Sequence, residues 1–281
     1  MRFYIYANPK KDVDCVFTKK IVDFLCDGEN SVGVHERAAR FFPGREIVSA
    51  PSADCDVAIV VGGDGTILSA AVDCAKVNLP VFGFNLGHVG FLTEGEPTAY
   101  ADALRKLQSG KFKKESRALL RCRLPGGKDI YALNDVVVER STGKMITVKI
   151  FSNGSYIDSH RCDGFIVSTP TGSTAYSLSA GGPIVSPTAE VLALTPINSH
   201  SLHSKPMIVG KSERITVSVE SGNKITVFAD GKSVENAIGP ASVQVEFSNV
   251  TATFIRTDGY NFYEKLLKKL NTWSTDNNIE E

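Results

Sequence analysis

One apolar strand followed directly by a glycine turn limits what this chain can fold into. Residues 57–61 read Val-Ala-Ile-Val-Val and are apolar on both faces, which suits a central parallel strand covered by helices. The turn Gly62-Gly63-Asp64-Gly65-Thr66 follows at once, and a helical pattern of apolar residues runs from Thr66 to about Lys76. A strand that passes through glycines into a helix predicts an open α/β sheet with a ligand site at the turn.

The segments on either side of this turn continue the alternation of strand and helix. Strands are predicted at 3–7, 57–61 and 81–85, and helices at 16–26, 66–76 and 100–107. This order predicts a doubly wound, Rossmann-like α/β domain over residues 1–110. A C-terminal helix over 261–270 carries Phe262, Leu266, Leu267 and Leu270 on one stripe, and we expect the segment 257–281 to return to the first domain.

From about residue 111 the pattern changes to short β-branched segments separated by turn signals. These segments stand at 130–139, 146–151, 164–168, 215–219, 224–228, 241–247 and 250–255. Their spacing predicts an all-β domain of the sandwich type over residues 111–256. We interpret the basic stretch Lys111–Arg123 as a solvated link and edge strand rather than a nucleic-acid patch.

The charge balance excludes several classes of protein. The 281 residues contain 31 Lys and Arg against 31 Asp and Glu, so no net field draws the chain to nucleic acid or to an anionic membrane. The longest apolar run, 57–61, is far too short to span a bilayer. The six cysteines include no Cys-x-x-Cys pair, which favours reduced thiols in a cytoplasmic protein over a zinc or disulfide-exchange site.

The carboxylate inside the glycine turn indicates the chemistry of the site. The turn is neither a Walker loop nor a dinucleotide fingerprint, but its glycines let a phosphate approach backbone N–H groups at the positive end of a helix. Gly62, Gly63 and Thr66 are therefore candidate phosphate-binding residues. Asp64 would repel an anion, yet it suits a neighbouring hydroxyl that must lose a proton, or a metal ion. The alternative is a tight turn in which Asp64 only forms hydrogen bonds.

A second motif, residues 163–183, is rich in hydroxyl groups. Eight of the twelve residues from Ser168 to Ser179 carry a hydroxyl. Neutral donors and acceptors next to a Pro/Gly turn suit ribose, amide and base edges better than bare phosphate. The alternative is a Ser/Thr-rich surface loop, but Ala175, Gly181 and Gly182 are small where such a loop more often carries charge.

These motifs, in order over almost the whole length, make the chain resemble the NAD kinases, which phosphorylate NAD to NADP. The resemblance rests on the Gly62–Thr66 turn, the glycine-rich segment Gly83–Leu92, the pair Asn134-Asp135 and the block 163–183. The glycine turn is shared with diacylglycerol and sphingosine kinases. The sequence Thr169–Ser177 is much more specific to NAD kinases, so it separates this family from the lipid kinases.

The resemblance implies a role for each matching residue. Asp64 would be the catalytic base on the 2′-hydroxyl of the adenosine ribose, with Gly65 beside it in the nucleotide site. Phe91 would contact adenine, and Asn134 and Asp135 would hold ribose hydroxyls. The remaining substrate-binding residues that it implies are Arg161, Asp163, Thr174, Ala175, Tyr176, Ser177, Leu178, Ser179, Asn198 and Lys232. Asp135 and Lys232 stand where the family usually has Glu and Gln. The loop 195–206 also departs from the family's usual sequence around Asn198.

The resemblance also implies ATP or polyphosphate as the phosphoryl donor, with Mg²⁺ or Mn²⁺ held by ligands that the sequence does not identify. It implies a homo-oligomer, a dimer or a tetramer, and leaves open whether NAD or NADH is the acceptor. Two alternatives are a lipid kinase of the diacylglycerol type and a non-catalytic NAD(P)-binding regulator. The neutral charge and the hydroxyl-rich block argue against the first, and the presence of Asp64 argues against the second.

Overall fold

The chain separates into two compact units in a computed structural model, which describes residues 1–87, 90–201, 204–257 and 260–275. One unit, here called the α/β unit, contains residues 1–116 and the C-terminal segment from residue 252 onward. The other, the β unit, contains residues 117–251. The sequence predicts domain boundaries at 110/111 and 256/257, within a few residues of these positions.

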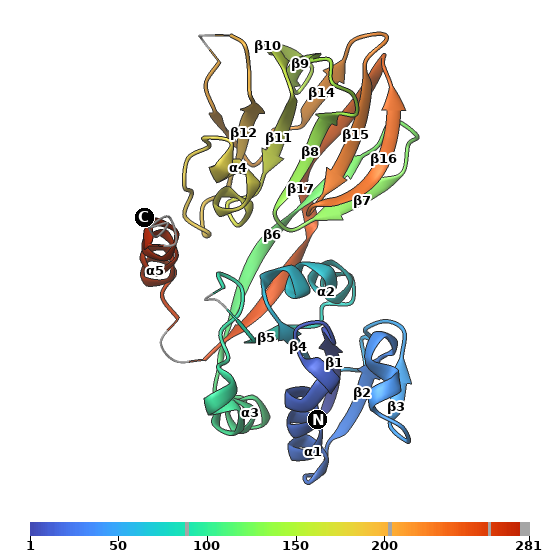
Figure 1. The fold of residues 1–281 in the computed structure, drawn as a ribbon, viewed down its shortest axis with the longest axis vertical. Helices are drawn as coiled ribbons and strands as arrows, with labels where there is room; N and C mark the ends of the chain where they lie inside the picture. The colour runs from blue at the N-terminus through green and yellow to red at the C-terminus, as the bar shows by residue number, and fades with distance from the viewer. Residues whose placement is uncertain (88–89, 202–203, 258–259, 276–281) are drawn as a thin grey trace, which may run out of the picture. The chain divides into compact units, whose positions relative to one another are not determined.

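The α/β unit alternates strands and helices along the first part of the chain (Figure 1). Its strands are β1 (Arg2–Ala7), β2 (Ser31–His35), β3 (Glu46–Val48), β4 (Val57–Gly62) and β5 (Val81–Asn85). Its helices are α1 (Val16–Cys26), α2 (Asp64–Lys76), α3 (Tyr100–Gln108) and α5 (Phe262–Thr275), with 3-10 turns η1 (Val13–Cys15), η2 (Glu36–Phe41) and η3 (Pro97–Ala99). The five strands are parallel in the order β3-β2-β1-β4-β5, which is the order of a doubly wound sheet.

Helices cover both faces of this sheet. One apolar cluster joins Phe3, Ile5 and Phe82 of the strands to α1 and α3. On the opposite face α2 packs so closely that a Cβ on Gly83 would lie 2.4 Å from Ile67 Cδ1. The start of α1 is held by Asp12, whose carboxylate accepts the N–H groups of Phe17 and Thr18. The predicted Rossmann-like domain is confirmed.

The β unit consists of two antiparallel sheets. The first has the order β10-β9-β14-β17 with β6 and β7 alongside, and the second has the order β13-β12-β11-β8-β15-β16. The bounds are β6 (Lys113–Arg123), β7 (Asp129–Ala132), β8 (Asp135–Arg140), β9 (Ile146–Ser152), β10 (Ser155–Cys162), β11 (Gly164–Ser168), β12 (Val191–Ile197), β13 (Met207–Gly210), β14 (Ile215–Val219), β15 (Lys224–Ala229), β16 (Lys232–Ile238) and β17 (Ala241–Arg256). Between β11 and β12 lie η4 (Gly172–Thr174) and α4 (Tyr176–Ser179).

One apolar core lies between the two sheets of the β unit. It joins Val148 and Val217 of the first sheet to Val138, Phe165 and Val227 of the second. Alternate residues of these strands point inward, as expected for sheets packed face to face. The predicted sandwich-type domain is therefore confirmed.

Several predicted elements differ from the structure. The helix predicted from Thr66 begins two residues earlier, so Asp64 lies in the first turn of α2. The single strand predicted over 130–139 is two strands, β7 and β8, interrupted at Leu133 and Asn134. The strands predicted at 241–247 and 250–255 form one continuous strand, β17.

Six strands were not predicted: β2, β3, β10, β12, β13 and β16. Most are short or largely polar, and β12 contains Pro196, which weakens a strand pattern. The interpretation of Lys111–Arg123 as solvated is wrong for Arg117, which is only 2% exposed within β6. The predicted apolar stripe on α5 is wrong for Leu267, which is 60% exposed, while Phe262, Leu266 and Leu270 are half-buried.

No helix within the described residues is long and apolar enough to cross a membrane.

Candidate functional site

The glycine turn lies where the strand order of the α/β sheet reverses. β1 and β4 are neighbours, and the chain leaves them toward opposite sides of the sheet, which opens a crevice at their carboxyl ends. Asn8, directly after β1, donates its N–H to Val61 O at 3.0 Å and its side-chain amide to Thr66 Oγ1 at 3.2 Å. The loops that follow the two strands are therefore joined side by side at this crevice.

The glycines of the turn serve two different purposes. A Cβ on Gly62 would lie 2.3 Å from Thr66 Oγ1, so Gly62 is needed for close packing of strand on helix. Gly63 precedes the first turn of α2, whose leading N–H groups lack helical acceptors. The Lys11 ammonium lies 3.0 Å from where a Gly63 Cβ would be. Of the predicted phosphate-binding residues, buried Gly62 and Thr66 therefore shape the turn, while Gly63 lies beside a cation.

The Asp64 carboxylate is held by three consecutive backbone N–H groups. Phe91 N–H donates to Oδ2 at 2.8 Å, and Leu92 and Thr93 N–H donate to Oδ1 at 3.1 and 3.4 Å. The carboxylate also lies across Gly90, where a Cβ would come within 2.2 Å of Oδ1. Side chain and glycine-rich segment therefore fit each other closely, although the motif residues His88 and Val89 lie outside the described chain.

The carbonyl groups of the same three residues are held from the C-terminal side. Phe91 O accepts the Tyr260 hydroxyl at 3.3 Å, Leu92 O accepts Arg256 Nη1 at 3.0 Å, and Thr93 O accepts the Lys265 ammonium. Each residue from 91 to 93 therefore donates its N–H to Asp64 and accepts a hydrogen bond at its carbonyl from a residue between 256 and 265. Burial, the largest cause, and Arg256 lower the pKa of Lys265 to about 8.

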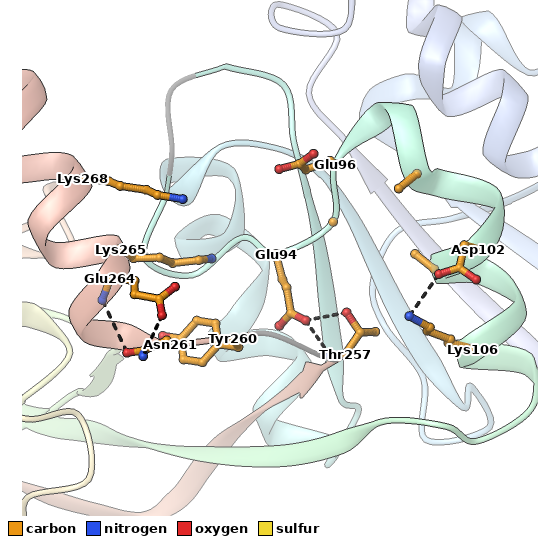
Figure 2. A pocket seen from close by; sticks show the side chains of 13 residues that line it. Glu94, Glu96, Asp102, Lys106, Thr257, Tyr260, Asn261, Glu264, Lys265 and Lys268 are labelled. Carbon is orange, nitrogen blue, oxygen red and sulfur yellow. Dashed lines mark hydrogen bonds and ion pairs between the residues drawn. The ribbon is translucent and has the colours of Figure 1, made fainter.

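Arg256 anchors this arrangement. Its guanidinium is buried, pairs with Glu115 at 2.5 Å and lies 3.8 Å from the centre of the Tyr260 ring. Glu94 follows the 91–93 segment and accepts the Thr257 N–H and hydroxyl (Figure 2). A cavity of about 340 Å³ opens beside it, lined by both acidic and basic side chains of α3 and α5. The end of β17 and the start of α5 thus brace the segment that holds Asp64.

α5 also reaches Asp64 itself. The Lys269 ammonium lies 3.5 Å from Asp64 Oδ2 and 4.3 Å from the centre of the Phe91 ring. Phe91 is 8% exposed and packs against Phe262 in a tilted arrangement with ring centres 5.9 Å apart. The prediction that Phe91 contacts adenine stays a prediction, and the ring is covered by α5 in this structure. The sequence pattern contained no sign that Lys265 and Lys269 would lie at this site.

In the β unit, the predicted pair Asn134-Asp135 occupies the break between β7 and β8. Asp230 accepts the N–H groups of Leu133, Asn134 and Asp135 at 2.8, 2.7 and 3.3 Å. Asp135 is 4% exposed, and burial together with the charge of Asp230 raises its pKa to about 7. Asp135 therefore keeps its proton far more readily than an ordinary aspartate. Lys232, predicted to contact substrate, is exposed at the start of β16 and acts to lower the pKa of Asp230, which burial raises.

Two other predicted residues, Asp163 and Asn198, are in direct contact. Asn198 donates its side-chain amide to Asp163 Oδ2 at 3.1 Å, and Arg140 pairs with Asp163 Oδ1 at 2.7 Å. Asn198 has a φ of 46°, a left-handed conformation that asparagine tolerates better than most residues. Arg161 is exposed, and its carbonyl accepts the N–H of His200 at 3.0 Å.

The hydroxyl-rich block folds onto the Asn134 turn. A Cβ on Gly172 would lie 2.1 Å from Asn134 O, so the block can approach this closely only with glycine there. Thr174 and Ser177 are buried, and Ser177 shares a 2.9 Å hydrogen bond with Thr195. Several of these hydroxyl groups therefore form hydrogen bonds within the protein and are not available to a ligand.

The outer residues of the block are more accessible. Tyr176 and Ser179 are exposed, and Ala175 and Leu178 are half-buried. Burial, together with the nearby carboxylates of Glu139, Asp163 and Asp135, raises the pKa of the Tyr176 phenol. The predicted residues Tyr176, Asp163 and Asp135 therefore lie near one another in the β unit. Buried Arg117, which donates to Thr171 Oγ1 at 3.3 Å, was not predicted because it follows a stretch of exposed lysines at 111, 113 and 114.

The sequence is similar to those of known proteins over both of its parts. Residues 17–112 match the model of the ATP-NAD kinase N-terminal domain, and residues 133–257 match that of the ATP-NAD kinase C-terminal domain. The NAD kinase of Thermoanaerobacter sp. (strain X514) is 35% identical over 276 residues, covering 95% of this chain and 97% of the relative. The NAD kinase of Methanopyrus kandleri is 36% identical over 252 residues, covering 89% and 87%.

Solved structures agree with the sequence matches. The NAD kinase of Archaeoglobus fulgidus in complex with ATP has a TM-score of 0.77 at 30% identity, covering 97% of this chain and 99% of that one. Yeast NADH kinase complexed with NADH shares the fold, with a TM-score of 0.81 at 24% identity over 100% of this chain and 89% of that one. With matching models over both parts of the sequence and relatives aligned over nearly its full length, the chain belongs to the NAD kinase family.

Proposed function

We propose that this protein transfers the terminal phosphoryl group of ATP to the 2′-hydroxyl of the adenosine ribose of NAD, giving NADP. The observation that carries the proposal is the Asp64 carboxylate, held by three N–H groups in the first turn of α2 at the crevice of a doubly wound sheet. A fixed carboxylate at such a crevice suits a hydroxyl that must be oriented and deprotonated.

In the proposed reaction the ribose 2′-oxygen attacks the terminal phosphorus of ATP and the bond to ADP breaks. The proton of the hydroxyl passes to Asp64. Because the transition state of phosphoryl transfer is loose, the base mainly orients the hydroxyl and accepts its proton late. The N–H groups that lead α2, next to Gly63 and Gly65, and the Lys11 ammonium would bind the phosphates of the donor.

The β unit would supply recognition of the dinucleotide. Asn134 and Asp135 would hold ribose hydroxyls, and a protonated Asp135 can donate a hydrogen bond as well as accept one. Asp163 with Asn198, exposed Arg161, and the 174–179 segment would contact the bases and the remaining polar groups. Lys232 would contribute a cation close to Asp230.

The residues present fit a metal ion that arrives with the nucleotide. Within the described chain, no group of three His, Cys, Asp or Glu side chains lies close enough to hold an ion. Mg²⁺ in such sites is usually bound by the substrate's phosphates with one or two carboxylates and waters, so a dedicated protein cage is not required. When bound, Mg²⁺ or Mn²⁺ would neutralise charge on the donor phosphates. We further propose a cytoplasmic homo-oligomer, a dimer or a tetramer.

An assay of NADP formation tests the function. The purified protein is incubated with ATP or polyphosphate, with NAD or NADH, and with Mg²⁺, Mn²⁺ or EDTA, and the phosphorylated dinucleotide is separated and quantified. We expect product from ATP and NAD with a divalent ion and none with EDTA. Phosphorylation of diacylglycerol without any NADP would favour a lipid kinase. Calorimetric binding of NAD without turnover under every donor and metal would favour a non-catalytic regulator.

A further inference from the structure

The hydrogen-bonding capacity of the Asp64 carboxylate is already filled in this structure. A carboxylate offers about four acceptor positions on its two oxygens. Three are taken by the N–H groups of Phe91, Leu92 and Thr93. The fourth direction, at Oδ2, faces the Lys269 ammonium at 3.5 Å. An incoming hydroxyl must therefore displace one of these partners before it can donate its proton to Asp64.

The three backbone partners are not free to leave. The carbonyl groups of the same three residues accept hydrogen bonds from Tyr260, Arg256 and Lys265. Rotating the peptide group of the Leu92 or the Thr93 N–H away from Asp64 would also break the hydrogen bond of the carbonyl in the same peptide group, to Tyr260 or to Arg256, which costs about 1–3 kcal/mol. The Phe91 N–H belongs to the residue whose carbonyl Tyr260 holds. Among the partners of Asp64 in the described chain, Lys269 alone makes contact through a side chain.

Lys269 is suited to release Asp64 and stay nearby. Its distance of 3.5 Å is longer than the roughly 2.7–2.9 Å of a strong charge-assisted hydrogen bond, so the pair is a loose one. Its ammonium already lies 4.3 Å from the centre of the Phe91 ring. A cation over an aromatic face keeps a favourable contact when it leaves the carboxylate. The ammonium can therefore move away from Oδ2 without losing every partner.

Building on the proposed function, we propose that Lys269 is a positioning residue that occupies the place of the acceptor hydroxyl on Asp64 and exchanges with it when substrate binds. Before binding, the ammonium holds the carboxylate in place and satisfies its fourth acceptor position. After the exchange it remains protonated beside the reacting groups, where it offsets the negative charge of the phosphoryl group being transferred. The proton that moves in the reaction passes from the hydroxyl to Asp64, and Lys269 neither gains nor loses one.

The exchange predicts opposite effects on binding and turnover when the ammonium is removed. In Lys269→Met the acceptor hydroxyl no longer competes with a cation, so the KM for NAD should fall about two- to fivefold. The kcat should fall about tenfold or more, because the negative charge of the phosphoryl group being transferred is no longer offset. Lys269→Arg keeps the charge and should recover most of the kcat.

Lys268→Met is the matched control, because Lys268 is the preceding residue of α5 and is exposed. Steady-state kinetics for NAD and ATP, NAD binding by calorimetry and thermal unfolding are measured for all three variants and the wild type. A fall in kcat without tighter NAD binding, accompanied by a lower Tm, would assign Lys269 to bracing α5 and overturn the exchange. Kinetics equal to those of Lys268→Met would also overturn it. If the wild type forms no NADP, the proposed function fails instead.

Discussion

Asp64 in the α/β unit and Asp230 in the β unit are each held by three consecutive backbone N–H groups. Asp64 accepts from residues 91–93 and Asp230 accepts from residues 133–135, at distances between 2.7 and 3.4 Å. In both cases the carboxylate and its donors are far apart in the sequence. Two regions with unrelated secondary structure therefore use the same way of fixing an acidic side chain.

The two carboxylates differ in their remaining neighbours. Asp64 is paired with a cation, Lys269, at 3.5 Å, and both side chains are half-buried. Asp230 lies beside a second acid, the buried Asp135, and burial raises the pKa of both groups. One carboxylate thus has a side-chain partner that the proposed exchange replaces with substrate, whereas the other shapes the Asn134-Asp135 turn. The difference predicts that changes at Asp64 affect turnover and changes at Asp230 affect stability and binding.

The largest effect is expected from Asp64→Asn. An amide of the same shape retains most of the packing but cannot accept the proton, so kcat should fall about a thousandfold. NAD binding by calorimetry should change little, and the free energy of unfolding should drop by only about 1 kcal/mol. Turnover within tenfold of the wild type would show that Asp64 is not the base.

Asp230→Ala should have the opposite signature. The substitution leaves the N–H groups of Leu133, Asn134 and Asp135 without their acceptor, and it places an alanine at a φ of 48°. The free energy of unfolding should therefore fall by about 3 kcal/mol. In the fraction that remains folded, the KM for NAD should rise more than kcat falls. Urea unfolding and steady-state kinetics provide both numbers, and a stable protein with a collapsed kcat would contradict the distinction between the two carboxylates.

Gly90→Ala changes the position of the Asp64 carboxylate while leaving Asp64 itself in place. The new methyl group would start 2.2 Å from Asp64 Oδ1 and must push the carboxylate aside, so kcat should fall about a hundredfold. Gly87→Ala is the matched control, because a Cβ there meets nothing within 4 Å. Equal kinetics for the two variants would mean that the position of the carboxylate is not critical.

The smallest effect concerns the pH dependence of stability set by Asp135. Its pKa of about 7 in the folded protein lies above the value of about 3.9 expected for an unfolded chain. Between these values the folded state holds a proton that the unfolded state has lost, so the wild type loses stability as pH rises from 4 to 7. Asp135→Asn lacks this titration and should gain on the wild type by about 2 kcal/mol between pH 5 and 7. Thermal unfolding of both proteins across this range measures the gain, and parallel curves would show that Asp135 is ionised when buried.

Local pattern was sufficient for the elements that depend on nearest neighbours. The apolar run 57–61 had to be covered on both sides, and the glycine turn after it could only lead into a helix, so β4, α2 and the α/β class followed. α1 was predicted with its observed bounds because its apolar period and its Asp27-Gly28 end are local. Asp64, Asn134, Asp163 and Tyr176 came from motifs, which are also local.

Local pattern did not predict the features that depend on residues distant in the sequence. The interruption between β7 and β8 was missed because Asp230, almost a hundred residues later, holds the turn open. The basic stretch predicts a solvated Arg117 because it begins with the exposed Lys111, Lys113 and Lys114, whereas the fold buries Arg117 against Thr171. β12 and β16 form where adjacent strands offer unpaired backbone groups, which their own residues do not indicate.

The sequence alone determined the strand, the glycine turn and the acid within it, because close packing and backbone geometry at that turn tolerate few other residues. Only the tertiary structure decided what surrounds that acid. The N–H groups of 91–93, the side chains of Arg256, Tyr260 and Lys265 and the ammonium of Lys269 come from segments that only the folded chain brings together. Hydrogen bonds and ion pairs act over a few ångströms in space and are indifferent to separation in sequence, so these partners could not be read from any local pattern.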